Sequence, residues 1–265
     1  MTTGALIFAF NNNDIDYLAM AAWSARNIRR HLDIPVAVIT NATPTAGDFD
    51  YVISAEPEQG GTRYFDDFGK NVLWYNAGRT DAYDLTPFEQ TLVLDADYIV
   101  ASSQLKSLLV TQQEFLCHRT AFDVATANSL DSLNHFGIHQ MPMWWATVML
   151  FKKSNMSQYI FDCMKMIKQN WQHYRDLYGI QKSTYRNDFA LSIALGIVSG
   201  QTWQVDEIPW QLASVMPKDK IKQIDQDHYE ITFLDQQNTP KSVSMSGFDI
   251  HAMGKRYLGD IIESN

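Results

Sequence analysis

The chain has 265 residues, of which 46% are hydrophobic, and a formal net charge of −9 at pH 7. This length and apolar content suit one large domain with a full core, and so acidic a chain gains little from general attraction to phosphate backbones, which argues against a general nucleic-acid binder. The N-terminus has no basic region, no apolar run is long enough to span a membrane and only two cysteines occur, so we expect a cytoplasmic protein without a disulfide framework or an integral membrane segment.

The first forty residues predict a strand, a helix and a second strand. Ala5 to Phe10 is a short apolar run typical of a buried strand, and the polar turn Asn11 to Asp14 offers residues that cap a helix. Apolar residues at helical spacing then predict a helix over about residues 16–32, and Pro35 to Ile39 predicts the next strand. Such a unit favours a parallel sheet with a right-handed crossover.

The rest of the chain continues this α/β pattern and then changes to antiparallel strands. Patterning predicts strands at 50–53, 92–94, 115–118 and 146–151, a turn at Gly60–Gly61, helices over 65–79 and 156–174 and from about 187, an irregular segment at 119–144, and a hairpin of 229–233 with 242–246. We therefore expect an α/β fold with a mixed central sheet, flanking helices and a C-terminal antiparallel hairpin.

Two aspartates follow the strand at 92–94 and are the most informative feature of the chain. Asp95 and Asp97 stand where the strand ends, and ligands of open α/β sheets bind outside the carboxyl ends of the strands. Two neighbouring carboxylates repel unless a cation holds them, and oxygen ligands on a short turn favour Mg²⁺ or Mn²⁺. The same pattern also occurs in plain turns and helix N-caps, so the residues alone leave both interpretations open.

With the strand–helix–strand start and the late segment His251-Ala-Met-Gly254-Lys255, these aspartates resemble the GT-A fold nucleotide-sugar glycosyltransferases. The resemblance is to family 8, which contains glycogenin and the bacterial lipooligosaccharide galactosyltransferases, and it spans Ala5 to Lys255. It implies a single domain over 1–265 with a Rossmann-like mixed sheet. Residues 1–100 would be the nucleotide-sugar-binding half, and 101–265 the acceptor half with the C-terminal metal-ligand segment.

The resemblance implies a metal site and a phosphate site. Asp95, Asp97 and His251 would hold Mn²⁺ or Mg²⁺, and an imidazole among carboxylates shifts the preference toward Mn²⁺. Gly254 and Lys255 would contact the pyrophosphate, although the family usually places this lysine six residues after the histidine rather than four. For His251 alone, the alternative is a surface histidine without a ligand.

The resemblance also implies a site for the base. The turn with Phe10, Asn11 and Asn12 would hold a uracil, and Tyr17 would stack on it. The alternative for Tyr17 is a core residue at the start of its helix.

On the sugar side, Lys70 of Lys70-Asn-Val-Leu-Trp resembles a family lysine on a helix that reaches the donor sugar or phosphates, with Arg63 or Arg79 as substitutes. Asp188 takes the position of a catalytic aspartate near the reacting sugar, and Phe189 stands where glutamine is usual. The alternatives are solvated surface cations and a partner for a helix N-terminus.

We therefore predict a metal-dependent glycosyltransferase that moves a sugar from a nucleotide diphosphate sugar, a UDP-sugar by resemblance, to an acceptor hydroxyl, with retention implied. The acceptor is open: a saccharide, a protein, a lipid-linked glycan or a modified nucleobase. Trp144 and Trp145 are candidates for stacking on it and Asp123 is a further sugar-binding candidate, whereas His135 and His139 lack the glutamate of a zinc protease motif. Rival functions are a nucleotidyltransferase, which normally has a glycine-rich basic loop near its start, and a non-catalytic nucleotide-sugar-binding module.

Overall fold

A six-stranded mixed sheet forms the centre of the computed structural model, which describes residues 2–58, 61–130, 133–181 and 184–263. Its strand order is β3-β2-β1-β6-β12-β8; the first four strands run parallel, and β12 runs antiparallel to both neighbours. The strands are β1 (Thr3–Phe8), β2 (Val36–Thr40), β3 (Tyr51–Ser54), β6 (Gln90–Leu94), β8 (Phe115–His118) and β12 (Trp145–Lys152). The predicted mixed α/β sheet and these six strands are confirmed.

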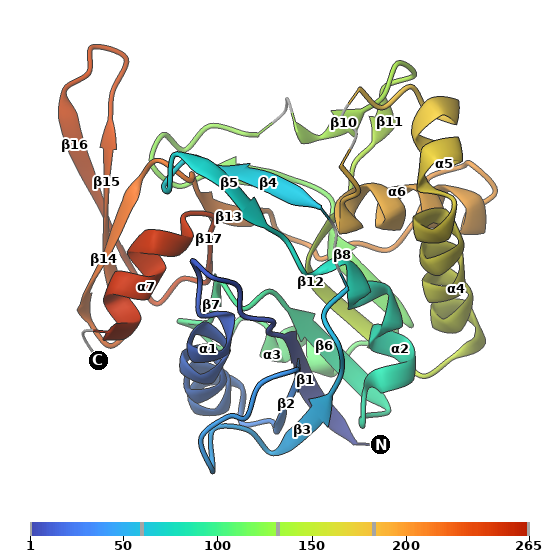
Figure 1. The fold of residues 1–265 in the computed structure, drawn as a ribbon, viewed down its shortest axis with the longest axis horizontal. Helices are drawn as coiled ribbons and strands as arrows, with labels where there is room; N and C mark the ends of the chain where they lie inside the picture. The colour runs from blue at the N-terminus through green and yellow to red at the C-terminus, as the bar shows by residue number, and fades with distance from the viewer. Residues whose placement is uncertain (1, 59–60, 131–132, 182–183, 264–265) are drawn as a thin grey trace.

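Helices cover both faces of this sheet. Successive side chains of β1 point to opposite faces and are mostly apolar, so both faces have to be buried. Ile7 packs in one hydrophobic cluster with Ile28 of α1 (Tyr17–Leu32). Leu6 packs in another with side chains of α4 (Asn155–Gln169) and α6 (Asn187–Val198). Figure 1 shows α1 and the α4–α6 pair on different sides of the central strands. With both faces covered, the central strands are buried and mostly apolar, with Leu92, Val93 and Leu94 of β6 as the sequence predicted.

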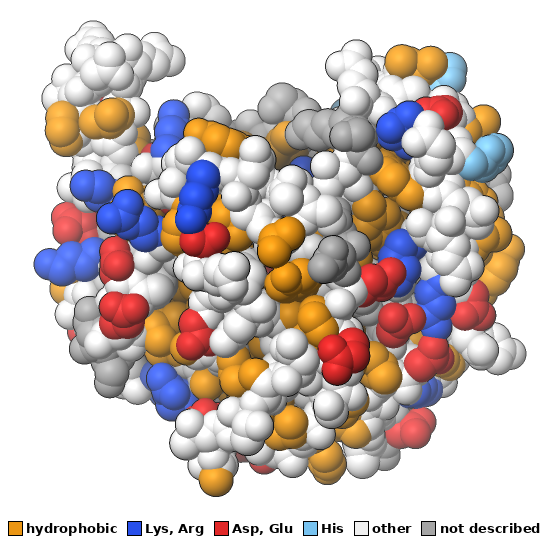
Figure 2. Space-filling view, in the orientation of Figure 1, with side chains coloured by type: hydrophobic (Ala, Val, Ile, Leu, Met, Phe, Trp, Pro, Cys, Tyr) orange, Lys and Arg blue, Asp and Glu red, His pale blue; other side chains and the backbone are white. Residues whose placement is uncertain are grey.

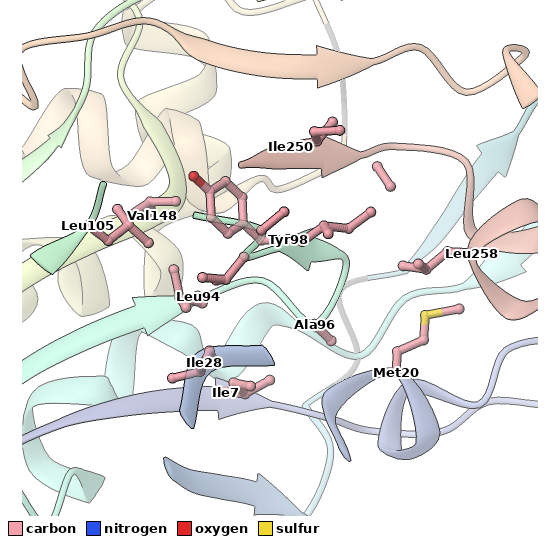
Figure 3. Close-up of a cluster of buried hydrophobic side chains, with 14 of the residues drawn as sticks. Ile7, Met20, Ile28, Leu94, Ala96, Tyr98, Leu105, Val148, Ile250 and Leu258 are labelled. Atoms are coloured by element: carbon pink, nitrogen blue, oxygen red, sulfur yellow. The ribbon is translucent and has the colours of Figure 1, made fainter. Parts of the chain in front are cut away.

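A second sheet has the order β7-β17-β13-β9 and stands next to the carboxyl end of β6. Its strands are β7 (Tyr98–Ile99), β9 (Ala121–Asp123), β13 (Leu212–Val215) and β17 (Ile250–Ala252). Leu94, Tyr98, Ile250 and Leu258 share one buried cluster, in which Leu258 comes from α7 (Lys255–Glu263) (Figure 3). The C-terminal helix α7 therefore packs against β6 and β7.

The helix predicted over residues 65–79 is wrong, because this segment is mostly a β-hairpin. Its strands are β4 (Thr62–Phe65) and β5 (Lys70–Leu73). Gly69 has φ +63° in the connecting turn, a left-handed conformation that a helix does not use. Gly61 of the predicted turn has φ +93°, whereas Gly60 lies outside the described residues.

The helix predicted over 156–174 is two helices. Asn170 ends α4 with φ −114° and its side-chain amide donates to Met166 O at 2.9 Å, after which α5 begins. The described parts of the segment 119–144, which are 119–130 and 133–144, contain the short strands β9, β10 and β11, joined by loops and turns. The remaining short elements of the fold, within and outside this segment, are η1 (Ala77–Asp81), α2 (Ala82–Leu85), α3 (Lys106–Leu109), α5 (Trp171–Leu177), β10 (His135–Phe136) and β11 (Met141–Pro142).

The predicted C-terminal hairpin is confirmed and extended by one strand into an antiparallel meander of β14 (Lys220–Asp225), β15 (His228–Leu234) and β16 (Pro240–Ser246). β15 and β16 project from the body, and Figure 2 shows the surface hollowed between this projection and the one that carries β10, β11 and α5. No helix of the described chain is both long and apolar enough to cross a membrane.

Candidate functional site

The pairing of β7 with β17 brings together the three predicted metal ligands. Asp95 follows β6, Asp97 precedes β7, and His251 lies in the middle of β17 opposite Tyr98. The Ala252 N–H donates to Asp97 O at 3.0 Å and fixes this register. One ligand atom from each of the two carboxylates and the imidazole lies within 4.8 Å of the others. Residues from distant parts of the sequence therefore form one compact donor set.

This donor set fits a divalent cation. His251 Nδ1 is buried and has no hydrogen-bond partner among the described residues, while Nε2 lies 3.6 Å from Asp97 Oδ2. Burial lowers the pKa of His251 against the opposing effect of Asp95, which favours the neutral imidazole that metals bind. Two carboxylates with one imidazole suit Mn²⁺, and Mg²⁺ less well.

Each carboxylate of the set also contacts one cationic side chain. Arg79 of η1 is 2% exposed and donates to Asp95 Oδ1 and, at 2.6 Å, to Ala146 O. Lys255, at the start of α7, pairs with Asp97. Burial lowers the pKa of Lys255 to about 8 despite the opposing charge of Asp95, so the ammonium is still mostly protonated at neutral pH. Both cations are therefore held at the predicted metal ligands.

Asp188 faces the same space from the first turn of α6. Its Oδ1 accepts the Ala146 N–H at 3.0 Å and its Oδ2 accepts from the Arg186 guanidinium at 2.6 Å. Burial alone would raise the pKa of Asp188, but Arg186 and the Ala146 hydrogen bond outweigh it and hold this pKa below its ordinary value. The carboxylate is thus ionised at neutral pH.

One cavity joins these groups to part of the predicted donor site. The predicted residues that line it are Phe10, Tyr17, Asp95, Asp97, Asp188, His251 and Lys255. Burial raises the pKa of Tyr17 despite the nearby Arg63 charge, so its hydroxyl keeps its proton. Trp74 and Trp145 add two further aromatic side chains to the lining. The cavity therefore offers carboxylates, cations and flat apolar surfaces together.

Three other predicted residues do not line this cavity and hold the surrounding loops. Asn11 Oδ1 accepts the Leu18 N–H at 2.8 Å at the start of α1. Asn12 shapes the turn after β1 and donates to Leu73 O at 2.9 Å, which attaches β5. Lys70 lies on β5, not on a helix, and pairs with Asp14. These contacts place the β4–β5 hairpin beside the cavity without bringing the Lys70 ammonium to its wall.

Of the remaining candidate residues, one lines the cavity and three do not. Gly254 adjoins Lys255 but does not line the cavity; a Cβ there would lie 2.9 Å from Pro217 O, so the glycine permits a close backbone approach. Asp123 accepts the Ala125 N–H at 2.9 Å within a local turn. Of the tryptophan pair, Trp145 lines the cavity and Trp144 does not.

Sequence reasoning missed Arg186 and treated Arg63 and Arg79 only as substitutes for Lys70, although all three arginines line the cavity. The sequence did contain one signal for Arg186: it stands two residues before Asp188, the acidic residue in the first turn of α6. Arg63 precedes the predicted helix, and its place at the cavity depends on the β4–β5 hairpin, which the helix prediction missed.

No protein-family model and no curated protein sequence matches this chain. Among solved structures it is similar to the glycosyltransferase GlyE of Streptococcus pneumoniae TIGR4, with 13% identity, 79% of this chain and 46% of that chain covered, and a TM-score of 0.43. It is also similar to the galactosyltransferase LgtC in complex with donor and acceptor sugar analogues (19%, 72% and 70%, 0.46) and to the bifunctional glycosyltransferase WbbM (11%, 78% and 39%, 0.41). The chain thus spans less than half the length of GlyE and of WbbM.

Proposed function

We propose that this protein is a metal-dependent glycosyltransferase that moves a sugar from a UDP-sugar to an acceptor hydroxyl. The observation that carries the proposal is the donor set of Asp95, Asp97 and His251 in a cavity that also holds Lys255, Arg79 and an ionised Asp188. Carboxylates and an imidazole suit a divalent cation, and the cations beside them suit a diphosphate.

The aromatic lining supports a nucleotide donor. Phe10 and Tyr17 lie at the carboxyl end of β1 and the start of α1, next to the metal ligands. Their ring faces offer a stacking surface for a base, and the sequence resemblance implies that this base is uracil.

The charged residues would act mainly on the leaving group. When bound, a divalent cation would neutralise charge that develops on the departing diphosphate. Lys255 and Arg79 add two fixed positive charges at the same place, and such preorganised electrostatic stabilisation is usually the largest catalytic contribution. Asp188, held rigidly by Arg186 and the Ala146 N–H, would orient the hydroxyl groups of the sugar.

Retention at the anomeric carbon belongs to the proposal through the family resemblance. Phe189 takes the place of the usual glutamine, and its ring is buried against Phe136 and Trp171 rather than in the cavity. No side chain at this position can therefore take over the polar role of that glutamine. Proton NMR of the product would show the anomeric configuration directly.

The test is release of UDP from UDP-sugars with added Mn²⁺, alone and with acceptor panels of saccharides, peptides, lipid-linked glycans and nucleosides. We expect Asp95→Asn and Asp97→Asn to lower turnover by at least about 100-fold, because each removes a charged metal ligand. Asp84→Asn is the matched control, since this carboxylate pairs with Lys165 at the surface, and its turnover should stay within about twofold of wild type.

Other outcomes separate the rival functions. Unchanged turnover in both aspartate variants would overturn the metal assignment. Binding of UDP with Mn²⁺ but no transfer to any acceptor would indicate a binding module. Release of diphosphate from a nucleoside triphosphate and a sugar phosphate would indicate a nucleotidyltransferase.

A further inference from the structure

Among the described residues, the cavity is lined by one cationic side chain more than it has carboxylates. Four cationic side chains and three carboxylates of these residues line it. Arg79 pairs with Asp95, Lys255 with Asp97, and Arg186 with Asp188. Each carboxylate is thus matched by one cation, and Arg63 is left over.

Arg63 comes from β4 and has no carboxylate within ion-pair distance in the described part of the chain. Its guanidinium carbon lies 3.6 Å from the centroid of the Trp74 ring, which holds the planar group by a cation–π contact. Stacking uses the face of the guanidinium and leaves its edge, with five N–H donors, free to bind an anion.

A second guanidinium faces the same cavity. Burial lowers the pKa of Arg63 to about 10, the positive charge of Arg186 lowers it further, and the more distant charges of Asp188 and Asp95 oppose the shift without forming an ion pair with Arg63. Arg63 therefore stays protonated at neutral pH while it is repelled by Arg186. Both arginines are partly buried in the cavity wall, and an anion bound beside both would relieve this repulsion, because a charge that is partly removed from water is stabilised by an opposite charge.

In the proposed function, the divalent cation balances the negative charge of the donor diphosphate. The positive charge of Arg63 then still has no negative charge paired with it. We infer that Arg63, with Arg186 across the same cavity, binds an oxyanion of the substrate other than the diphosphate. This group would be a carboxylate or phosphate, carried either by the transferred sugar or by the acceptor. The inference rests on the proposed function and specifies its substrate class as anionic.

Calorimetry with Mn²⁺ tests the donor first. UDP-glucuronate and UDP-glucose differ only at C6 of the sugar, which is a carboxylate in the first and a hydroxymethyl group in the second. Wild type should therefore bind the uronate at least about tenfold more tightly, as expected for a charge-assisted hydrogen bond. Arg63→Gln should remove this preference and leave UDP affinity within about twofold, and Arg63→Lys should restore part of it. Arg26→Gln, an exposed arginine of α1, is the control and should behave as wild type.

The second arm tests the acceptor. Glucuronate, glucose and inorganic phosphate are titrated into the complex of protein, UDP and Mn²⁺. Tighter binding of the two anions to wild type than to Arg63→Gln, by about tenfold, would place the oxyanion on the acceptor. Thermal melting of each variant confirms that it is folded.

Two results would overturn the inference: equal loss of UDP affinity in Arg63→Gln, which would assign Arg63 to the diphosphate, or no difference between wild type and variant in either arm. If wild type fails to bind UDP, the proposed function fails instead. The phosphate titration of wild type and Arg63→Gln, with Mn²⁺ alone, then still decides whether Arg63 binds an oxyanion.

Discussion

His118 is a buried side chain whose protonation is coupled to folding. It is fully buried in β8; its Nδ1 lies 3.0 Å from Trp210 O, and its Nε2 has no hydrogen-bond partner among the described residues. Burial lowers the pKa of His118 to about 4, although the Trp210 carbonyl opposes this shift. The folded protein therefore holds a neutral imidazole at pH values where the unfolded chain, with a pKa near 6.5, begins to bind a proton.

The expected pH dependence follows from this difference. The contribution of His118 to stability is complete above pH 6.5 and is lost as the pH falls toward 4, by about 2–3 kcal/mol in total. Urea unfolding of wild type and His118→Asn between pH 4 and 7.5 measures it. The variant should be less stable overall but should lose less stability over this range, whereas the exposed control His139→Asn should lose as much as wild type. Identical pH slopes for wild type and His118→Asn would refute the assignment.

At the scale of elements, two helical glycines make opposite predictions. A Cβ at Gly196 of α6 would lie 2.3 Å from the Trp203 ring, whereas a Cβ at Gly259 of α7 would meet nothing within 4 Å. Gly196→Ala should therefore destabilise the protein by about 1–3 kcal/mol through overpacking, and Gly259→Ala should stabilise it by about 0.5–1 kcal/mol. Thermal and urea unfolding measure both. A stabilising Gly196→Ala would mean that Trp203 has room to move.

Elements with a clear apolar period were predictable from the sequence, and those set by turns were not. β6 contains the apolar run Leu92 to Leu94, and α1 has a mostly apolar buried face at helical spacing, so tertiary packing only reinforces these two patterns. The residues 65–79 also have apolar side chains at helical spacing, but Gly69 forms a turn and the two arms pair with each other instead. Asn170 likewise interrupts a pattern that reads as one helix. In both places one residue of special conformation overrides the periodicity.

The candidate site shows the same division. Asp95 and Asp97 are separated by one residue and follow a recognisable strand, so their proximity was predictable. His251 needed the sequence resemblance, because only the pairing of β17 with β7 brings it to Asp97. Arg63 and Arg186 reach the cavity through a hairpin and through the residue before a helix. Such non-local placements leave no periodic trace in the sequence.

At the scale of the whole molecule, the site is a junction between the two ends of the chain. The cavity takes Tyr17 and Asp95 from the first hundred residues and Asp188 and Lys255 from the rest. Its β4–β5 wall is attached to α7, because Asp67 Oδ2 accepts the Arg256 N–H at 2.9 Å. Only the folded chain assembles this cavity, so a ligand that binds there must stabilise the fold as a whole.

A thermal-shift experiment with UDP and Mn²⁺ measures this coupling. At a ligand concentration of about 100 Kd, binding to the folded state adds about 2.7 kcal/mol, which for a chain of this size raises Tm by about 5–10 °C. UDP or Mn²⁺ alone should raise Tm less, because the diphosphate and the cation each complete the other's coordination. Asp97→Asn should lose the joint effect, since it removes a proposed metal ligand at the contact between β7 and β17, while Asp84→Asn should retain it. A joint shift that survives Asp97→Asn would show that UDP and the metal bind elsewhere on the molecule.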